Sequence, residues 1–122
     1  MKVLITGSAG FIGFHLSSLL LKKKIKIVGI DNLNNYYDKK IKIDRNRILL
    51  KNKNYKFFKI DITNKKRLIN IFSKNRFDVV INLAAQAGVR YSLKDPEKYI
   101  QSNVIGFYNI IEACKNYKVK NF

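Results

Sequence analysis

The sequence predicts an α/β fold in which a doubly wound parallel sheet of about four strands is covered by flanking helices. Three observations predict it. Short apolar runs alternate with segments of helical periodicity along the chain. The first apolar run ends in a glycine-rich turn, and a helical segment follows that turn directly. The next apolar run comes after the length of chain that a crossover helix requires, so adjacent strands are expected to run parallel.

The N-terminal part of the chain is expected to form a strand, a helix and a second strand. Residues 2–6 (KVLIT) make a short apolar run that stops at a glycine. Residues 25–31 (IKIVGID) alternate and then run apolar into an acid, a pattern typical of a second strand. Between them, apolar residues and one histidine recur at helical spacing. The residues expected to face the core from this helix are Phe11, Ile12, His15, Leu16, Leu19 and Leu20.

The middle of the chain is expected to add a helix and then a further strand with its own helix. The polar, lysine-rich residues 32–54 predict a loop followed by an exposed helix. Residues 57–60 predict a third strand, and Thr63 or Asn64 is expected to cap the helix that follows. The inward-facing residues of these two helices are expected to be Ile41, Ile48 and Leu49, and Leu68, Ile69 and Phe72.

The C-terminal part is expected to form a buried strand and a long helix. Residues 78–85 (DVVINLAA) are nearly all apolar, which predicts a fourth strand covered on both faces of a parallel sheet. Asp95-Pro96 places a capping residue before a proline, which predicts the start of a long, well-packed helix. Its inward-facing residues are expected to be Ile100, Val104, Phe107, Ile111 and Cys114.

The composition limits the classes of function. The 122 residues suit one domain, and 47% hydrophobic residues are enough to bury a core. The 25 Lys and Arg against 8 Asp and Glu give a net charge of +17, which alone is typical of a nucleic-acid partner. These basic residues are spread along the chain, and the Lys, Ile and Asn bias of an AT-rich coding sequence explains them. We therefore expect no nucleic-acid partner.

Two further features bear on localisation. Cys114 is the single cysteine, which excludes an internal disulfide and a cysteine-ligated zinc site, so we expect a cytoplasmic protein with no metal site. Residues 3–21 contain no Asp, Glu, Lys or Arg and are nearly long enough to span a bilayer. Their glycines and serines favour a folded turn and helix instead, so no membrane association is expected.

The turn after the first strand carries the strongest motif. Gly7, Gly10 and Gly13 form the pattern G-x-x-G-x-x-G between a strand and a helix. In a Rossmann-like fold, the first glycine allows the turn, the second lets backbone approach a pyrophosphate, and the third permits close helix-strand packing. The helix N-terminus adds free N–H groups and a partial positive charge. An ordinary tight turn is the alternative, but the acid that ends the next strand favours a nucleotide site.

Asp31 is expected to select the cofactor. It ends the second strand, where a carboxylate can accept both ribose hydroxyls of the adenosine half of NAD. Its charge would repel a 2′-phosphate, so NAD is favoured over NADP. Two alternatives stay open: Asp31 caps a turn, or Lys39 or Lys40 folds back near the ribose and permits NADP.

Two other polar residues in the predicted site each admit two roles. Asp61 ends the third strand, where it hydrogen-bonds adenine with Ile62 as apolar cover, or caps the following helix. Asn103 lies in an otherwise apolar stripe, and a buried amide needs partners. It bonds neighbouring backbone, or it orders the loop after Ala85. His15 is expected to pack at the edge of the core, since no neighbour offers it a catalytic partner.

The motifs together resemble the N-terminal part of a known family. The matching segments are TGSAGFIG at 6–13, DNLNNYYD at 31–38, DI at 61–62 and NLAAQAGVRYS at 82–92. In this order they are similar to the extended short-chain dehydrogenase/reductase family, specifically its NAD-dependent sugar-nucleotide epimerases and dehydratases. The second and fourth segments are most similar to the UDP-glucuronate 4-epimerase branch. The resemblance implies that residues 1–122 are the N-terminal part of an NAD-binding Rossmann domain, with no second domain in this sequence.

The resemblance also implies NAD as the cofactor and a site built from the strand ends. The pyrophosphate would lie on the glycine turn, the adenosine ribose near 31–36, the adenine between 61 and 62, and the nicotinamide toward 83–86. Arg90 would contact an anionic sugar nucleotide, or it is a surface arginine without a ligand. The implied cofactor-binding residues are Gly7, Gly10, Phe11, Ile12, Gly13, Asp31, Asn32, Asn35, Tyr36, Asp61, Ile62, Leu83, Ala84, Ala85, Gln86 and Asn103.

The implied reaction is C4 epimerisation of a UDP-sugar such as UDP-glucuronate through a 4-keto intermediate. The family's catalytic Tyr-x-x-x-Lys pair follows a fifth strand, which would begin at residues 119–122. Two other pairs have this spacing, but one lies on the adenosine side and the other on a predicted strand. These pairs are Tyr36 with Lys40 and Tyr55 with Lys59.

We therefore expect no catalytic residue within the 122 residues, no activity of this chain alone, and weak NAD binding or none. The intact enzyme is expected to be an isomerase and a homodimer that acts on a nucleotide-sugar substrate. The alternatives are another NAD-dependent dehydratase or epimerase, and a non-catalytic NAD-binding module.

Overall fold

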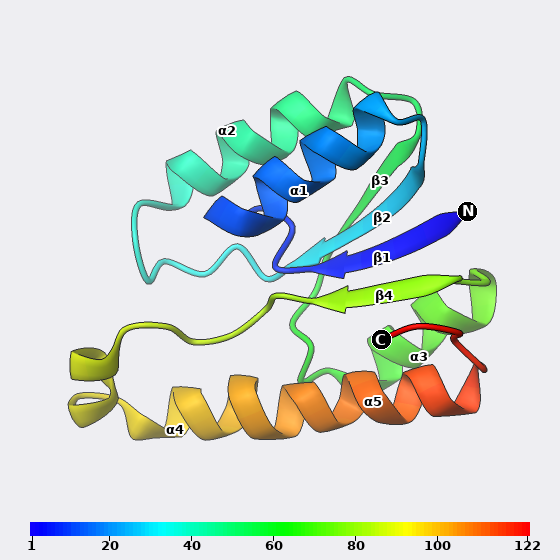
Figure 1. Ribbon diagram of the computed structural model, residues 1–122. Coiled ribbons are helices and arrows are strands. Elements are labelled where there is room, and N and C mark those ends of the chain that lie inside the picture. The colour runs from blue at the N-terminus through cyan, green and yellow to red at the C-terminus, as the bar shows by residue number, and fades with distance from the viewer.

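The computed structural model describes residues 1–122, and its strands form one parallel sheet of four (Figure 1). The strands lie in the order β3-β2-β1-β4, so the chain starts in the interior of the sheet and extends it first to one side and then to the other. This doubly wound arrangement confirms the predicted fold class. The strands are β1 (Lys2–Thr6), β2 (Lys26–Asp31), β3 (Tyr55–Lys59) and β4 (Val79–Asn82).

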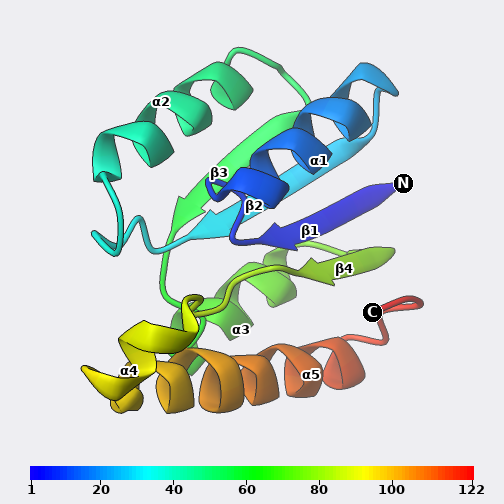
Figure 2. The ribbon, with the colours of Figure 1, turned by 60° about the vertical axis from the view of Figure 1, so that its left-hand side comes forward.

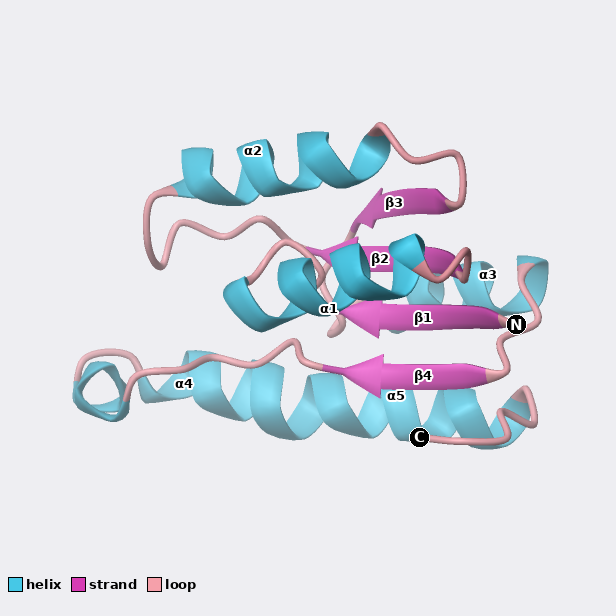
Figure 3. Ribbon diagram, turned by 45° about the horizontal axis from the view of Figure 1, so that its top comes forward, coloured by secondary structure: helices cyan, strands magenta, loops and turns pink.

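The four strands end at the same edge of the sheet. Thr6 of β1 lies beside Ile30 of β2 and beside Asn82 of β4, while Asp31 lies beside Lys59 of β3. The loops after all four strands therefore leave from this carboxyl edge (Figure 3). In open α/β sheets, ligands bind in the crevice outside that edge.

Helices cover both faces of the sheet (Figures 1 and 2). Helices α1 and α2 lie on one face, and α3 and α5 lie on the other. A short α4, a π-helical segment η2 and α5 follow one another as a continuous rod, preceded by the 3₁₀ turn η1. The bounds are α1 (Phe11–Lys22), α2 (Lys39–Leu50), α3 (Lys65–Lys74), η1 (Val89–Leu93), α4 (Pro96–Tyr99), η2 (Ile100–Gly106) and α5 (Phe107–Asn116).

The core is divided by the sheet into two apolar clusters, because successive strand side chains point to opposite faces. Leu4 and Val28 join the larger cluster, of 13 residues, with side chains from α3 and α5. Val3 and Ile27 join the smaller cluster, of 6 residues, with side chains from α1 and α2. More apolar surface is therefore buried on the α3 and α5 face, and we expect that face to contribute more to stability.

The inward face of α1 differs from the prediction. Leu16 and Leu20 are half-buried as expected, but Phe11, Ile12, His15 and Leu19 are exposed. The glycine turn holds the start of α1 close to the backbone of β1, so the helix meets the sheet through small side chains. His15 packs edge-on against the rings of Phe11 and Phe14, which precede it in the helix. The buried residues of α1 are Gly13, Ser17 and Leu21.

The second and third helices are also partly rotated from the prediction. In α2, Ile41 and Ile48 are exposed and only Leu49 is buried as predicted. Two polar residues, Lys42 and Asn46, complete its inner face because this helix packs against a polar loop and a tyrosine hydroxyl. In α3, Leu68 and Phe72 are buried as predicted, while Ile71 replaces Ile69; Asn64 is its cap.

The buried face of the C-terminal helix differs most from the prediction. Of the predicted inner stripe only Cys114 is buried; Ile100, Val104, Phe107 and Ile111 are exposed. The π-helical segment changes the phase of the helix, so a stripe extrapolated at constant spacing leaves the sheet-facing side. A glycine and an asparagine then occupy the contact with the loop after β3, where Asn109 donates to the carbonyls of Ile62 and Thr63. The buried residues are Gly106, Asn109, Ile110, Ala113 and Cys114.

The strands are also somewhat displaced from their predicted bounds. Strand β3 begins at Tyr55, and β4 ends at Asn82 instead of continuing to residue 85. Only Val80 of β4 is fully buried, because β4 is the last strand of the sheet on its side. The segment after α5 returns beside β4, where the Val80 N–H donates to the Asn121 carbonyl at 3.0 Å.

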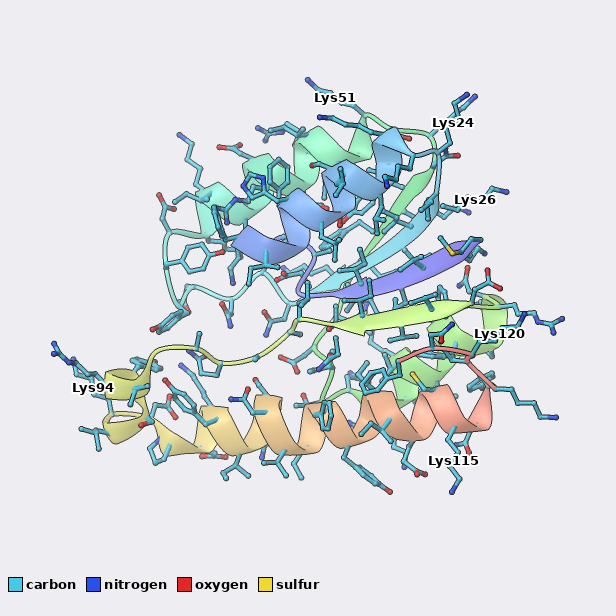
Figure 4. The ribbon with its side chains drawn as sticks, in the orientation of Figure 1. Lys24, Lys26, Lys51, Lys94, Lys115 and Lys120 are labelled. Atoms are coloured by element: carbon cyan, nitrogen blue, oxygen red, sulfur yellow. The ribbon has the colours of Figure 1, made fainter.

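The positive charge is distributed over several sides of the molecule. Lys24, Lys26 and Lys51 project from one end of the fold, and Lys94 projects from the opposite end (Figure 4). Lys115 and Lys120 project from the C-terminal helix and the segment after it (Figure 4). None of the helices combines the length and the apolarity needed to cross a bilayer.

Candidate functional site

A cavity of about 320 Å³ opens at the carboxyl edge of the sheet. It lies among the ends of the strands, the start of α1, the inner face of α2 and the loop after β4. Twelve of the predicted site residues line it: Gly7, Gly10, Phe11, Asp31, Asn32, Tyr36, Asp61, Ile62, Leu83, Ala84, Ala85 and Gln86.

The remaining predicted residues lie outside the lining of the cavity. Ile12 and Gly13 belong to the first turn of α1, and Asn35 lies in the loop before α2. Arg90 is an exposed residue of η1. Asn103, in η2, contacts the lining indirectly, through the backbone of Gln86.

The glycine turn is held by close backbone contacts. Gly7 has a φ of +66°, and a Cβ there would lie 2.9 Å from the backbone of Leu83 and Ala84. A Cβ at Gly13 would lie 2.2 Å from the Gly7 carbonyl oxygen, so only glycine lets α1 pack this closely on the turn. These contacts confirm the packing reasons predicted for the first and third glycines.

The start of α1 is open to an anion. Gly10 is its N-cap and has no side chain to accept from the first N–H groups of the helix. The first turn also contains no acidic residue. The first turn of α1 therefore contains no group that neutralises the partial positive charge of the helix N-terminus, and its residues Gly10 and Phe11 line the cavity.

Asp31 is held rigidly beside this turn. Its side chain is only 6% exposed; Oδ2 accepts the Ala9 N–H at 3.1 Å and Oδ1 accepts the Leu33 N–H at 2.8 Å. The carboxylate therefore does cap its own turn, one of the two predicted interpretations. Each oxygen can still accept a second hydrogen bond, so the turn does not exclude a ligand hydroxyl.

Asp61 also lines the cavity, and its carboxylate has different hydrogen-bond partners from that of Asp31. Its Oδ1 accepts from the N–H and hydroxyl of Thr63, and its Oδ2 accepts from the Asn32 amide at 2.7 Å. Burial opposes ionisation, but these hydrogen bonds outweigh it and hold the pKa of Asp61 below its usual value. The predicted helix-capping role is wrong, because Asn64 is the cap of α3.

The loop after β4 is fixed at both of its ends. The Thr6 hydroxyl accepts from the N–H groups of Leu83 and Ala84 at 3.1 and 3.0 Å. Further along, the Asn103 side chain accepts the Gln86 N–H at 2.8 Å and donates to the Gln86 carbonyl at 3.0 Å. Asn103 is exposed, so its predicted burial is wrong, but the predicted ordering of the loop after Ala85 is confirmed.

An aromatic contact joins the cavity lining to η1. The Tyr36 ring, from the loop after β2, meets the Tyr91 ring of η1 edge-on, with 5.1 Å between ring centroids. The Tyr99 hydroxyl donates to the Ala87 carbonyl at 3.0 Å and thus connects the loop after β4 to α4. The segments after β2 and β4 are joined by these side chains.

Neither Tyr-x-x-x-Lys pair has the geometry of a catalytic pair. Tyr55 lies in β3 with its hydroxyl buried beneath the glycine turn, and burial raises the pKa of Tyr55 to about 12. A proton acceptor needs the opposite shift. Tyr36 precedes α2, and Lys40 is an exposed residue of the helix that does not line the cavity.

Five polar or aromatic residues of the cavity were missed by the sequence prediction: Asn34, Tyr37, Lys42, Arg45 and Ser102. Lys42 is almost fully buried, whereas the predicted Lys39 and Lys40 are exposed and lie outside the lining. The available signal was the spacing of Lys42, Asn46 and Leu49, which share one helical face. In a segment so rich in lysine, that face is hard to distinguish from a solvated one.

Comparison with known proteins gives the following relatives. The family model described as GDP-mannose 4,6 dehydratase matches residues 4–122. Protein CapI of Staphylococcus aureus is 45% identical over 121 residues, which are 99% of this chain and 36% of that protein. The UDP-glucuronate 4-epimerase of Thermodesulfobacterium geofontis is 46% identical over 117 residues, which are 96% of this chain and 36% of that protein.

A solved structure gives the same correspondence. UDP-glucuronic acid 4-epimerase from Bacillus cereus, crystallised with UDP-glucuronic acid and NAD, superposes with a TM-score of 0.87 at 37% identity. The alignment covers 99% of this chain and 38% of that one. The chain thus spans little more than a third of the length of the relatives that it matches.

Proposed function

The chain belongs to the GDP-mannose 4,6 dehydratase family of NAD-dependent epimerases and dehydratases, and on that premise we propose that its cavity binds the adenosine and pyrophosphate half of NAD. One observation carries the proposal. An uncapped helix N-terminus at Gly10 and a rigid carboxylate at Asp31 line the same cavity. The first suits a pyrophosphate and the second suits a pair of ribose hydroxyls.

The proposed contacts follow the cavity wall from one end to the other. The pyrophosphate lies on the turn at Gly7 and Gly10, and on the N–H groups of the first turn of α1, Phe11, Ile12 and Gly13. The ribose lies against Asp31 and Asn32, with Asn35 and Tyr36 near it. The adenine lies between the edge of Asp61 and the apolar side chain of Ile62. The nicotinamide lies toward Leu83, Ala84, Ala85 and Gln86, with Asn103 behind them.

For the whole protein we propose C4 epimerisation of a UDP-sugar, with UDP-glucuronate as the substrate. The names of the relatives and the solved complex support this choice. NAD would take a hydride from C4 and return it to the other face of the sugar. Arg90, exposed on the loop after β4, would pair with an anionic group of the sugar nucleotide. The residues of this chain would bind and orient the cofactor; none is positioned as the C4 base.

A dehydratase is the second candidate, because the family model carries that description. Both reactions begin by oxidising C4, so they would use the same contacts in residues 1–122. We also propose that this chain is the N-terminal part of an NAD-binding domain in a cytoplasmic homodimer. The exposed apolar side chains of Ile100, Val104, Phe107 and Ile111 offer a surface for self-association.

The binding proposal is tested by calorimetric titration of ADP-ribose, which contains the part of NAD that these contacts hold. We expect weak but measurable binding to the 122-residue chain, and at least a tenfold loss, about 1.4 kcal/mol, in Asp31→Ala. Asp44→Ala is the matched control, since Asp44 lies on α2 outside the cavity lining. No heat with ADP-ribose, in a chain that unfolds cooperatively on heating, would contradict the proposal.

A further inference from the structure

We propose that Lys42 and Arg45 form a cationic subsite beside Asp31 that can hold a 2′-phosphate, so that Asp31 is the single group that keeps NADP out of the cavity. The inference deepens the proposed function and rests on it, because it assigns the 2′ position of the adenosine ribose to this part of the cavity. Cofactor selection then depends on the Asp31 carboxylate and on the two cations, Lys42 and Arg45, whose charge it opposes.

Lys42 is placed for this role by its burial. Its side chain is 7% exposed, and Nζ donates to Asn34 Oδ1 at 2.6 Å. Nζ also lies 4.7 Å from the centroid of the Tyr37 ring, a cation–π distance. An ammonium group has three N–H donors, and Asn34 uses one of them. Lys42 lines the cavity, so its remaining donors can meet a ligand there.

The electrostatic setting of Lys42 points to an anion. Burial lowers the pKa of Lys42, while the negative charge of Asp31 raises it. A cation held in a buried position is costly unless it is paired, and the negative charge of Asp31 offsets this cost only in part, because burial and the neighbouring Arg45 still hold the pKa of Lys42 below its usual value. A phosphate group would supply further negative charge at the same place and satisfy the unused donors.

Arg45 adds a second positive charge on the same face of α2. It is three residues after Lys42, which places both side chains on one side of the helix. Its Nη1 donates to the Tyr37 hydroxyl at 3.2 Å, and its guanidinium lies 5.7 Å from the centroid of the Phe11 ring at the start of α1. Tyr37 therefore contacts both cations, and both line the cavity that contains Asp31.

The two acidic residues of the cavity do not offset the charges of Lys42 and Arg45 equally. Asp31 and Asp61 are the two acidic residues of the lining. Asp61 accepts three hydrogen bonds, from Asn32 and Thr63, whereas Asp31 accepts two backbone N–H groups and also acts electrostatically on Lys42. Loss of the Asp31 charge would leave two cations and no opposing carboxylate at the ribose. The repulsion of a 2′-phosphate would then become attraction.

The test compares ADP-ribose with 2′-phospho-ADP-ribose, the corresponding halves of NAD and NADP, by calorimetry on the 122-residue chain. The wild type is expected to prefer ADP-ribose. Asp31→Asn is expected to shift the affinity ratio toward 2′-phospho-ADP-ribose by about tenfold or more, because it removes one repulsive charge at close range. Adding Lys42→Met to Asp31→Asn should remove most of that shift.

Two further variants keep the test decisive. Lys40→Met lies on the same helix but outside the lining, so in the Asp31→Asn background it should leave the ratio unchanged. Lys42→Met alone, in the wild-type background, should weaken 2′-phospho-ADP-ribose more than ADP-ribose, and it does not depend on the fold tolerating a change at Asp31.

The inference is overturned if Asp31→Asn, folded by its thermal unfolding curve, binds ADP-ribose without any shift in the ratio. It is equally overturned if the shift survives Lys42→Met and Arg45→Met together. If the wild type binds neither ligand, the proposed function itself fails, and the inference fails with it. The first two outcomes leave the proposed function intact, so the two failures are distinguishable.

Discussion

The Tyr55 hydroxyl lies 3.1 Å from the Ser8 Oγ and joins β3 to the glycine turn beneath the proposed pyrophosphate position. The same hydroxyl lies 3.1 Å from Asn46 Oδ1 of α2, so it can donate to the amide and accept from the serine. Gly29 of β2 leaves the space for this contact, since a Cβ there would lie 2.2 Å from the Tyr55 hydroxyl oxygen. Strands β2 and β3 and helix α2 thus meet at the buried Tyr55 hydroxyl, which supports the glycine turn.

Tyr55→Phe is expected to lower the free energy of unfolding by about 1–2 kcal/mol, because it leaves the buried Asn46 and Ser8 groups without their shared partner. Urea unfolding measures the change. Tyr108→Phe is the control: Tyr108 is 51% exposed and should change stability little. Equal stability of the two variants would show that the buried network contributes nothing.

Substitutions at Gly13 and Gly10 are expected to have different effects, the first on stability and the second on ligand binding. Gly13→Ala should lower the free energy of unfolding by about 1–3 kcal/mol, because its Cβ would lie 2.2 Å from the Gly7 carbonyl oxygen. At Gly10 the nearest such atom is 3.1 Å away, so Gly10→Ala should fold. Its methyl group would instead occupy the approach of the pyrophosphate and weaken ADP-ribose binding. Unfolding curves and calorimetry on both variants check this, and the reverse pattern would contradict it.

Asn103→Ala is expected to release the loop after Ala85. The variant loses both hydrogen bonds to the Gln86 backbone, so the Gln86 amide should exchange with solvent at least tenfold faster. Hydrogen exchange followed by NMR measures the rate. Asn70→Ala, on the exposed side of α3, is the matched control and should leave it unchanged. An unchanged Gln86 rate in Asn103→Ala would mean that other contacts hold the loop.

Asp61 is expected to make stability depend on pH in acid. Its pKa is lower in the folded protein than in the unfolded chain, so its contribution is fully present above the ordinary Asp pKa of 3.8. That contribution is lost as the pH falls through the lowered folded-state pKa. The stability advantage of the wild type over Asp61→Asn should therefore shrink between pH 7 and pH 3. An advantage that stays constant over this range would contradict the hydrogen-bonded carboxylate.

The 122-residue chain, supplied with NAD and UDP-glucuronate, is expected to form no C4 epimer. The reason lies in the residues that line the cavity: Tyr36 and Tyr37 are its tyrosines, and neither belongs to a helical Tyr-Lys pair. Chromatography of the sugar nucleotides after prolonged incubation measures conversion. Formation of the epimer above a protein-free blank would show that this account of the chemistry is wrong.

The backbone arrangement was predictable because its signals are local. Glycine spacing, the apolar runs and the acid at the end of β2 lie within short segments, and they predict the parallel sheet and the turn. The face that each helix buries was less predictable. The inner face of α1 is set by the Gly13 contact, and that of α5 by the phase change in η2, and both depend on tertiary packing.

The lining residues at the strand ends could be predicted from the sequence, and those that α2 contributes could not. Asp31 and Asp61 follow apolar runs, so their position at the carboxyl edge could be inferred. Lys42 is one of many lysines, and only the packing of α2 against the loop at Asn34 shows that it is buried. The role of Asn103 could be inferred because a lone amide in an apolar stripe requires partners, although the stripe itself is exposed.

We infer that the cavity holds the adenosine half of NAD between the ends of β2 and β3, with its pyrophosphate on the glycine turn. Intermolecular NOEs in the complex of the isotope-labelled chain with ADP-ribose would locate the ligand. We expect NOEs from the adenine protons to the Ile62 methyl groups, and from the adenosine ribose to residues 31 and 32. NOEs from adenine to Leu83 and Ala84 instead, or to residues outside the cavity, would contradict it.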